Sequence, residues 1–288
     1  MSSTGSFSPN ADGVLLPART VTHRHEEYDE AGFDLLADMQ ARHFWYLGRH
    51  RFLHCALKDA LRRAGLKPGA LAGVDLGGGC GGWVRYLNER WPGAFAKLAL
   101  ADSSPRALAL AAGVVGPNIE RYQVDLLDLP WEGRWDVAFL LDVLEHIPDD
   151  RRVLGQVRRS LHPKGLLLVT APALRVFWTY NDVLAHHLRR YSRRDLARLA
   201  EECGLEVCFT RYFQFFLSPL LLLSRLKAPD IASMTDVEIQ DHLKRTHQVP
   251  PWPANQVLRL FFSLETPLGL RFPFPWGTSV LAVLQRRN

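Results

Sequence analysis

The segment VDLGGGCGGW, from Val74 to Trp83, constrains the fold most, because it places a glycine-rich loop directly after an apolar run that ends in aspartate. Two interpretations of this loop are open. The glycines from Gly77 to Gly82 contain the G-x-G-x-x-G spacing of dinucleotide-binding folds, in which a pyrophosphate lies at a helix N-terminus. The second interpretation is a D-x-G-x-G-x-G loop suited to a cationic ligand, formed by Asp75, Gly77, Gly79 and Gly81.

Strand-like and helix-like segments alternate along most of the chain, which is typical of a parallel sheet covered by helices. Ser104 followed by Pro105 predicts a helix start, because serine caps helix N-termini and proline suits the first helical position. The apolar run at residues 135–142 predicts a strand that is buried on both faces. The predicted strands are 71–76, 97–101, 119–124, 135–142, 165–172, 205–213 and 278–285.

A chain of 288 residues with 47% hydrophobic content is long enough for one large α/β domain with additions. More than fifty residues separate the last two predicted strands, so we expect this stretch to contain helices of its own. The predicted organisation is a disordered lead-in at 1–22, an N-terminal helical cap at 23–66, the core at 67–211, a helical insertion at 212–276 and the final strand at 277–288.

The composition argues against a nucleic-acid partner and against a metal site. The net charge of +5 arises from 35 basic and 30 acidic residues that are scattered in short pairs, so no nucleic-acid partner is expected. The four cysteines have neither a C-x-x-C pair nor the spacing of a zinc site, which favours a reduced, cytoplasmic setting and predicts no metal site.

The most apolar stretch, from Tyr212 to Leu226, is interrupted by Gln214 and Pro219 and is shorter than the roughly 20 residues that span a bilayer. No transmembrane helix is predicted. The insertion at 212–276 has three open roles, which are a wall for a hydrophobic acceptor, a dimer face and a peripheral contact with a membrane surface. The oligomeric state is accordingly left open between monomer and homodimer.

Acidic residues decide between the two interpretations of the glycine loop. Asp75 would repel a pyrophosphate but attract an amine or a sulfonium, and Asp102 and Asp125 follow the next two predicted strands. S-adenosylmethionine meets these demands, because it joins adenosine to a sulfonium and an α-amino acid without a phosphate. We expect Asp102 to accept the ribose hydroxyls and Asp125 the adenine amino group, with each hydrogen bond to a charged acceptor worth about 1.5–3 kcal/mol.

The segments VDLGGGCGG, LADSS, VDLLDLPW, DVAFLLDVLEHIPDD and LHPKGLLLVTAP, in this order, resemble the class I S-adenosylmethionine-dependent methyltransferases. The resemblance covers about Leu71 to Val207 and is closest to the small-molecule branch that includes ubiquinone and menaquinone biosynthesis enzymes. It implies a Rossmann-like α/β fold, with a seven-stranded, mostly parallel sheet, an antiparallel last strand and helices on both faces. It also implies S-adenosylmethionine as cofactor and S-adenosylhomocysteine as product. The implied cofactor residues are Asp75, Gly77, Gly79, Gly81, Asp102, Ser103, Asp125, Leu126, Asp142 and Val143.

The segment PALRVFWTYNDVLAHHLRRYS borders the acceptor pocket in this fold, and it resembles a W-[ST]-x-x-D…H-x-R-R-Y pattern of one bacterial subset of the family. His187 is the candidate general base, since an unperturbed imidazole titrates near neutrality. Tyr191 is the second catalytic candidate. The alternative is that His187, Arg190 and Tyr191 only bind the loop to the sheet.

The segment RHFWYLGRHRF resembles the H-W-W-F-x-G-R-R entry of the same bacterial subset. It implies that Arg49 neutralises the carboxylate of the cofactor while Trp45 and Tyr46 cover the site. A helix that packs its aromatic side chains on the sheet is the alternative. The expected substrate-binding residues are Trp45, Tyr46, His146, Trp178 and Tyr180.

The resulting hypothesis is a methyltransferase that transfers a methyl group from S-adenosylmethionine to oxygen, nitrogen or carbon of a small molecule in bacterial secondary or cell-envelope metabolism. Two alternatives stay open. One is a catalytically silent partner subunit that binds S-adenosylmethionine. The other is an NAD-dependent oxidoreductase, which only the dinucleotide-type glycine spacing favours.

Overall fold

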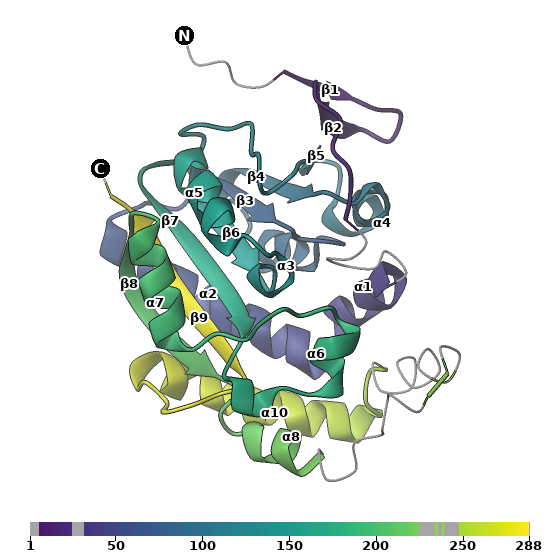
Figure 1. The fold of residues 1–288 in the computed structure, drawn as a ribbon, viewed down its shortest axis with the longest axis vertical. Helices are drawn as coiled ribbons and strands as arrows, with labels where there is room; N and C mark the ends of the chain where they lie inside the picture. Colours follow the sequence, from purple (N-terminus) through teal and green to yellow (C-terminus); the bar gives the residue numbers. More distant parts are fainter. Residues whose placement is uncertain (1–5, 25–31, 225–233, 236–237, 239–247, 288) are drawn as a thin grey trace.

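The computed structural model describes residues 6–24, 32–224, 234–235, 238 and 248–287, which form a twisted sheet with helices on both faces (Figure 1). The strand order is β1-β2-β5-β4-β3-β6-β7-β9-β8. The strands are β1 Phe7–Pro9, β2 Val14–Pro17, β3 Leu71–Leu76, β4 Phe95–Asp102, β5 Glu120–Gln123, β6 Trp135–Leu141, β7 Leu161–Pro172, β8 Leu205–Phe213 and β9 Ser279–Arg286.

Parallel pairing dominates the sheet. β3 pairs in parallel with β4 and β6, β4 with β5, and β6 with β7. The last strand, β9, lies between β7 and β8 and is antiparallel to both. The predicted mostly parallel sheet with an antiparallel last strand is confirmed. Because the carboxyl ends of the parallel strands meet at one edge, the residues that follow β3, β4 and β6 are brought together there.

Within the predicted disordered lead-in at 1–22, residues 7–9 and 14–17 form strands instead, which raises the strand number from seven to nine, while residues 1–5 lie outside the described residues. β1 and β2 form a hairpin, and β2 pairs in parallel with β5. Val14 is buried, and Phe7 packs edge-to-face on Tyr122, with the ring centroids 4.8 Å apart. The polar composition of this segment did not indicate a strand. The few apolar residues that hold it in place contact partners about a hundred residues away along the chain.

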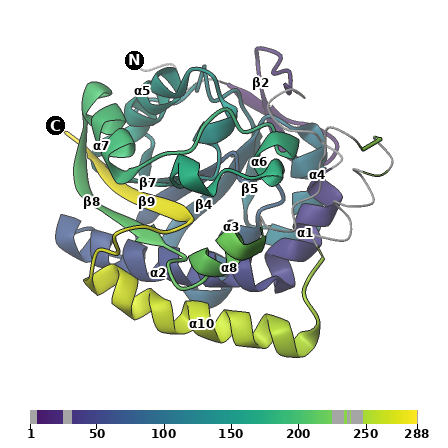
Figure 2. The same ribbon diagram turned by 60° about the horizontal axis from the view of Figure 1, so that its bottom comes forward.

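Helices divide between the two faces of the sheet, as predicted (Figures 1 and 2). One core contains Phe52, Trp83 and Phe262 from α2, α3 and α10, whereas the other contains Val153 and Leu196 from α5 and α7. α10 packs along α2. The helices are α1 Gly32–Arg42, α2 Phe44–Ala64, α3 Gly82–Arg90, α4 Pro105–Val115, α5 Asp150–Ser160, α6 Tyr180–Leu184, α7 Arg193–Glu202, α8 Ser218–Ser224 and α10 Trp252–Arg271, with short 3₁₀ turns η1 Leu144–His146 and η2 Arg175–Phe177.

Local chemistry explains where these helices begin. The Ser104 hydroxyl accepts the Ala107 backbone N–H and Pro105 is the first helical residue, as predicted. The long stretch before β9 contains the helices α8 and α10, although residues 225–233, 236–237 and 239–247 lie outside the described residues. Among the described residues, no helix has both the length and the apolar character required to cross a membrane.

Candidate active site

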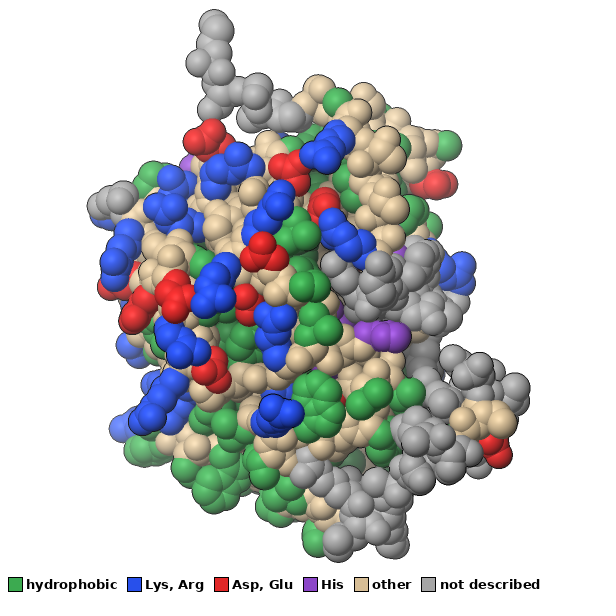
Figure 3. All heavy atoms as spheres, viewed as in Figure 1, with side chains coloured by type: hydrophobic (Ala, Val, Ile, Leu, Met, Phe, Trp, Pro, Cys, Tyr) green, Lys and Arg blue, Asp and Glu red, His purple; other side chains and the backbone are tan. Residues whose placement is uncertain are grey.

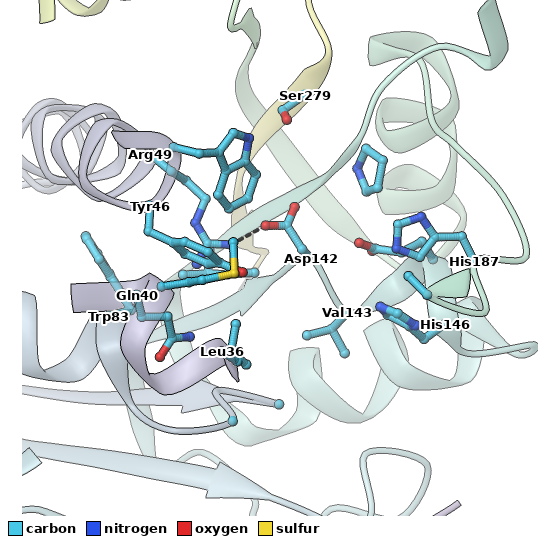
Figure 4. Close-up of a pocket in the computed structure, with 18 of the residues that line it drawn as sticks. Leu36, Gln40, Tyr46, Arg49, Trp83, Asp142, Val143, His146, His187 and Ser279 are labelled. Atoms are coloured by element: carbon cyan, nitrogen blue, oxygen red, sulfur yellow. Dashed lines mark hydrogen bonds and ion pairs between the residues drawn. The ribbon is translucent and has the colours of Figure 1, made fainter. Parts of the chain in front are cut away.

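A cavity of about 710 Å³ lies at the carboxyl edge of the parallel strands. Its lining includes two groups of residues, which we call the glycine side and the histidine side. The glycine side comprises Asp75, Gly77, Gly78, Gly79, Asp102, Ser103, Asp125 and Leu126. The histidine side comprises Glu145, His146, Asn181, Asp182, His187 and Arg190. The lining also includes Gln214, Leu217, Leu220, Leu221, Leu258 and Ser279. Figure 4 shows Asp142 and Val143 between Arg49, which comes from α2, and the two histidines.

The glycine turn after β3 requires residues without a side chain. Gly77, Gly79 and Gly81 have φ angles of 68°, 55° and 78°, in the left-handed region that other residues rarely adopt. A Cβ on Gly77 would lie 2.8 Å from the Val143 side chain. Asp102 Oδ2 accepts the Gly79 backbone N–H at 2.9 Å and so holds the turn in place. Gly81 is outside the lining and serves as the N-cap of α3.

Asp75 is a buried carboxylate at the cavity wall. Its side chain is almost fully buried, and its Oδ1 has no hydrogen-bond partner within the described part of the chain. Burial raises the pKa of Asp75 to about 7, although the nearby Arg49 lowers it. Burying a charge without a partner is costly, so this oxygen is prepared to meet a cation or a hydrogen-bond donor. This orphaned acceptor fits the amino group of S-adenosylmethionine.

Asp102 is the last residue of β4 and is buried at the same edge. Its Oδ1 accepts the Ser104 backbone N–H at 2.9 Å. Burial raises the pKa of Asp102, and backbone N–H bonds from Ser104 and Gly79 oppose that rise. Ser103 lines the cavity, and its Oγ lies 2.8 Å from His23 Nδ1.

Asp125 lines the cavity with a partner that the sequence did not indicate. Arg24 Nη2 lies 2.7 Å from Asp125 Oδ2. Burial raises the pKa of Asp125, but the hydrogen bonds from Arg24 and the Leu127 backbone N–H, together with the charge of Arg24, outweigh this and the net pKa is lowered. The carboxylate is therefore ionised, and Arg24 lies where it contacts the proposed adenine acceptor.

Arg49 and Asp142 form a nearly buried ion pair across the cavity (Figure 4). The guanidinium lies over the rings of Trp45 and Tyr46, at 4.9 Å and 5.2 Å from their centroids. Arg49 Nε is buried and has no acceptor in the described part of the chain, so this donor is available to a ligand carboxylate. Asp142 has φ of 57°, a conformation that is costly for a residue other than glycine and is typical of functional sites.

His187 is held by a carboxylate on the histidine side. Its Nδ1 lies 2.9 Å from Asp182 Oδ1. Arg190 donates to both oxygens of Asp182, at 2.7 Å and 2.9 Å. Burial opposes ionisation, but the hydrogen bonds from His187 and Arg190 hold the pKa of Asp182 far below its usual range. The permanent negative charge fixes the ring of His187 and leaves Nε2 as the nitrogen available to a ligand.

Glu145 completes the histidine side, although the sequence motif indicated only His146 as a site residue. Neither of its side-chain oxygens has a partner among the described residues. Burial raises the pKa of Glu145 well above its usual range, and Asp142 adds to the effect. The rings of His146 and His187 meet at 80°, with centroids 4.8 Å apart. The LEH segment could have indicated Glu145 only through its burial, which the sequence does not show.

Three predicted substrate or catalytic residues lie outside the lining, namely Tyr191, Trp178 and Tyr180. The Tyr191 hydroxyl donates to Asp150 Oδ2 at 2.8 Å and is buried, so Tyr191 joins the loop to α5 and has no contact with the cavity. For Tyr191 the structure favours the alternative of loop attachment over catalysis. The predicted residues that do line the cavity are Trp45, Tyr46, Arg49, Asp75, Gly77, Gly79, Asp102, Ser103, Asp125, Leu126, Asp142, Val143, His146 and His187.

Residues 47–208, more than half of the chain, match the sequence model of the family described as "Methyltransferase domain". The chain belongs to this methyltransferase family. The methyltransferase family and the cofactor S-adenosylmethionine, both predicted from the sequence, are confirmed by this membership. The dinucleotide interpretation of the glycine loop, and with it the NAD-dependent oxidoreductase, is set aside.

Trans-aconitate 2-methyltransferases are among the similar curated proteins. The one from Azoarcus sp. (strain BH72) is 34% identical over 117 residues, which are 41% of this chain and 45% of that protein. The one from Deinococcus radiodurans is 37% identical over 100 residues, 35% of this chain and 37% of that protein. The chain thus spans less than half the length of these relatives. An Escherichia coli O139:H28 relative is 28% identical over 194 residues, 61% of this chain and 75% of its own.

Solved structures share the fold at low sequence identity. Phosphoethanolamine N-methyltransferase 2 of Haemonchus contortus, in complex with S-adenosyl-L-methionine, has a TM-score of 0.52 at 16% identity. The alignment covers 80% of this chain and 52% of that one. The [4+2]-cyclase SpnF has a TM-score of 0.50 at 17% identity and is covered to 79%, with 80% of this chain aligned. A cyclase on the same fold shows that acceptor chemistry must be argued from the site.

Proposed function

We propose that the protein transfers a methyl group from S-adenosylmethionine to oxygen, nitrogen or carbon of a small molecule bound on the histidine side of the cavity. The observation that carries this proposal is one continuous cavity whose lining includes both an acidic glycine turn and an Asp182-oriented histidine. The first suits a cationic nucleoside without phosphate, and the second suits proton removal from an acceptor.

The residues on the glycine side, together with Arg49, carry the hydrogen-bond donors and acceptors that the cofactor requires. Asp75 Oδ1 would accept the ammonium group, and Arg49 Nε would donate to the carboxylate, because both are buried atoms without a partner among the described residues. Asp102 would accept the ribose hydroxyls, and Asp125 the adenine amino group in exchange for part of its contact with Arg24. Bound S-adenosylmethionine supplies a methyl group on a positively charged sulfur, ready for in-line displacement.

The chain itself must align the acceptor and receive a proton. Alignment of two reactants is worth about 7–11 kcal/mol, so positioning by the cavity wall contributes most of the effect. His187 Nε2 would take the proton of an acceptor hydroxyl or amine, and Asp182 would stabilise the resulting imidazolium. A general base of this kind contributes roughly 10²–10⁴-fold in rate.

The paired charges argue for an acceptor with little charge. Each arginine in the described lining is matched by an aspartate, in the pairs Arg24–Asp125, Arg49–Asp142 and Arg190–Asp182. Trans-aconitate carries three carboxylates and would need unpaired cations. Besides these pairs, the lining includes the apolar side chains of Leu217, Leu220 and Leu258. We propose that this chain has an acceptor other than the one in the names of its relatives.

The test is transfer of an isotopically labelled methyl group. The protein is incubated with labelled S-adenosylmethionine and either trans-aconitate or a panel of uncharged phenols, amines and enols, and S-adenosylhomocysteine is quantified alongside the labelled product. We expect label on an uncharged acceptor and none on trans-aconitate. Binding of S-adenosylhomocysteine without transfer to any panel member or to cell-extract metabolites would favour the catalytically silent subunit instead.

A further inference from the structure

The outward face of α10 carries an apolar stripe. Val257, Leu260, Phe261, Leu264 and Leu268 follow the i, i+3, i+4, i+7, i+11 spacing that places side chains along one side of a helix. Their exposed fractions lie between 42% and 58%. A stripe with this spacing normally faces a protein core. In α10 it faces away from the core.

Polar contacts on the opposite side of α10 fix this orientation. The Asn255 side chain accepts the Phe44 backbone N–H at 2.9 Å and donates to the Arg42 carbonyl at 3.0 Å. Glu265, which is fully buried, accepts the Phe216 backbone N–H at 2.9 Å. Rotating the helix to bury its stripe would break these bonds. The helix is therefore held with its more apolar side outward.

Neighbouring side chains extend the stripe into a larger surface, which we call the outer apolar face. Figure 3 shows hydrophobic side chains gathered at the lower edge of the molecule, where α8 and α10 lie. Contiguous exposed apolar surface of this kind marks an interaction site. The outer apolar face comprises Leu220, Leu222, Leu223, Val257, Leu260, Phe261, Leu264, Leu268, Phe272 and Trp276.

The charges on α10 favour an anionic lipid surface as the occupant. The exposed ionisable residue beside the stripe is Arg271, whereas Arg259 lies on the opposite side of the helix and the acidic residue, Glu265, is buried. Trp276, just beyond the C-terminal end of the helix, suits the interface between headgroups and acyl chains. A two-fold pairing with a second copy would instead bring together like surfaces that carry the same arginine.

The outer apolar face continues into the cavity. Leu220 is 57% exposed and also lines the cavity, and Leu258, which follows Val257 of the stripe, lines it as well. We propose that the outer apolar face docks on an anionic lipid bilayer, and that the acceptor is an uncharged head with an apolar chain that enters the cavity beside α8. The proposal about the acceptor, which we call the acceptor clause, rests on the proposed function. The proposal that the face docks on lipid, the docking clause, does not depend on it.

Vesicle co-sedimentation tests the docking clause. The full chain is mixed with vesicles of phosphatidylcholine alone or with phosphatidylglycerol, and we expect binding to the anionic vesicles that weakens with salt. Leu260→Gln with Leu264→Gln should lower the bound fraction at least tenfold. Val183→Gln on α6, where the wild-type side chain is 58% exposed like that of Leu260, is the matched control and should bind as wild type.

Two results would overturn docking on lipid. One is equal sedimentation of wild type and the double variant. The other is a wild-type dimer in light scattering that the double variant makes monomeric, which would assign the face to a second copy. Calorimetric binding of S-adenosylhomocysteine by all variants shows that they are folded. It also distinguishes failure of lipid docking from failure of the proposed function.

Ligand binding tests the acceptor clause. With S-adenosylhomocysteine at saturation, 4-dodecylphenol should bind with a stoichiometry of one, at least tenfold more tightly than phenol. Leu217→Gln should reduce this preference, because Leu217 lines the cavity without belonging to the outer apolar face. Equal affinity for the two phenols, or no binding of the long-chain compound, would contradict an acceptor with an apolar chain.

Discussion

Asp182 Oδ1 lies 2.9 Å from His187 Nδ1, and Arg190 donates to both oxygens of the same carboxylate. This arrangement fixes one ring nitrogen of His187 and leaves the other for an acceptor. Tyr191, the second catalytic candidate from the sequence, bonds to Asp150 instead. The two residues can therefore be separated by experiment.

His187→Gln should lower kcat at neutral pH by about 10²-fold or more, since a general base contributes 10²–10⁴-fold. The affinity for S-adenosylhomocysteine should not change, because the cofactor residues belong to the glycine side. Steady-state kinetics with the acceptor that the labelled-methyl assay identifies measure kcat, and calorimetry measures the affinity for S-adenosylhomocysteine. Wild-type turnover in this variant would remove the proposed role.

Tyr191→Phe should keep the wild-type kcat while lowering the free energy of unfolding by about 1–3 kcal/mol, because Asp150 loses a buried donor. Turnover and urea denaturation check the two parts. A large fall in kcat with unchanged stability would return Tyr191 to the catalytic residues.

Asp75 should make cofactor binding depend on pH. Burial raises its pKa to about 7, so the carboxyl group is protonated below that pH and ionised above it. Because the cationic cofactor prefers the ionised form, affinity for S-adenosylmethionine should rise roughly tenfold from pH 6 to pH 8 and then level off. Asp75→Asn should bind weakly at every pH. A wild-type affinity independent of pH would contradict this assignment.

The same shift has the opposite sign for the stability of the protein without cofactor. The folded pKa lies above the ordinary value of 3.8, so the folded state binds the proton more tightly than the unfolded chain does. Stability from this group is fully present below about pH 4 and is lost as the pH rises through 7. Urea titrations of wild type and Asp75→Asn across that range isolate the contribution.

Gly79→Ala and Gly81→Ala should have different effects although both glycines have positive φ. A Cβ on Gly79 meets only ordinary contacts at 3.4 Å but faces the cavity, so cofactor affinity should fall more than stability. A Cβ on Gly81 would lie 2.2 Å from Val115, so the free energy of unfolding should fall by about 2 kcal/mol or more. Calorimetry measures cofactor affinity and urea denaturation measures the free energy of unfolding of both variants. A larger loss of stability in Gly79→Ala than in Gly81→Ala would contradict this prediction.

Removal of metal ions should leave activity unchanged. Glu145, His146 and His187 each offer one ligand atom within 4.8 Å of the others. However, burial raises the pKa of Glu145 well above its usual range, which disfavours the charged form that a metal ligand requires. Activity before and after dialysis against EDTA is the measurement. A loss that a divalent cation restores would contradict the sequence prediction of no metal site.

The strand ends and their acidic residues could be predicted from the sequence because they depend on local signals. The apolar run of β6, the Ser104 cap and the glycine turn each require only neighbouring residues. The hairpin of β1 and β2 could not be predicted in this way, because its anchors are side chains such as Tyr122 on a distant strand.

The pairing of charges in the site also lay beyond the sequence. Arg49 and Asp142 are 93 residues apart, and Arg24 and Asp125 are 101 apart, so no spacing rule joins them. The outward orientation of the α10 stripe could not be predicted for the same reason. Its periodicity alone would predict a buried face, whereas the orientation is set by the contacts of Asn255 with residues more than two hundred positions earlier.

Calorimetric titration of the full chain with S-adenosylmethionine, S-adenosylhomocysteine and NAD tests the central claim most directly. The claim is that the bare turn and the acidic ends of β3 and β4 hold a positively charged nucleoside without phosphate. We predict saturable binding of the two sulfur nucleosides, weakened by Asp75→Asn, and no binding of NAD. Binding of NAD in their place, or of none of the three, would contradict the account.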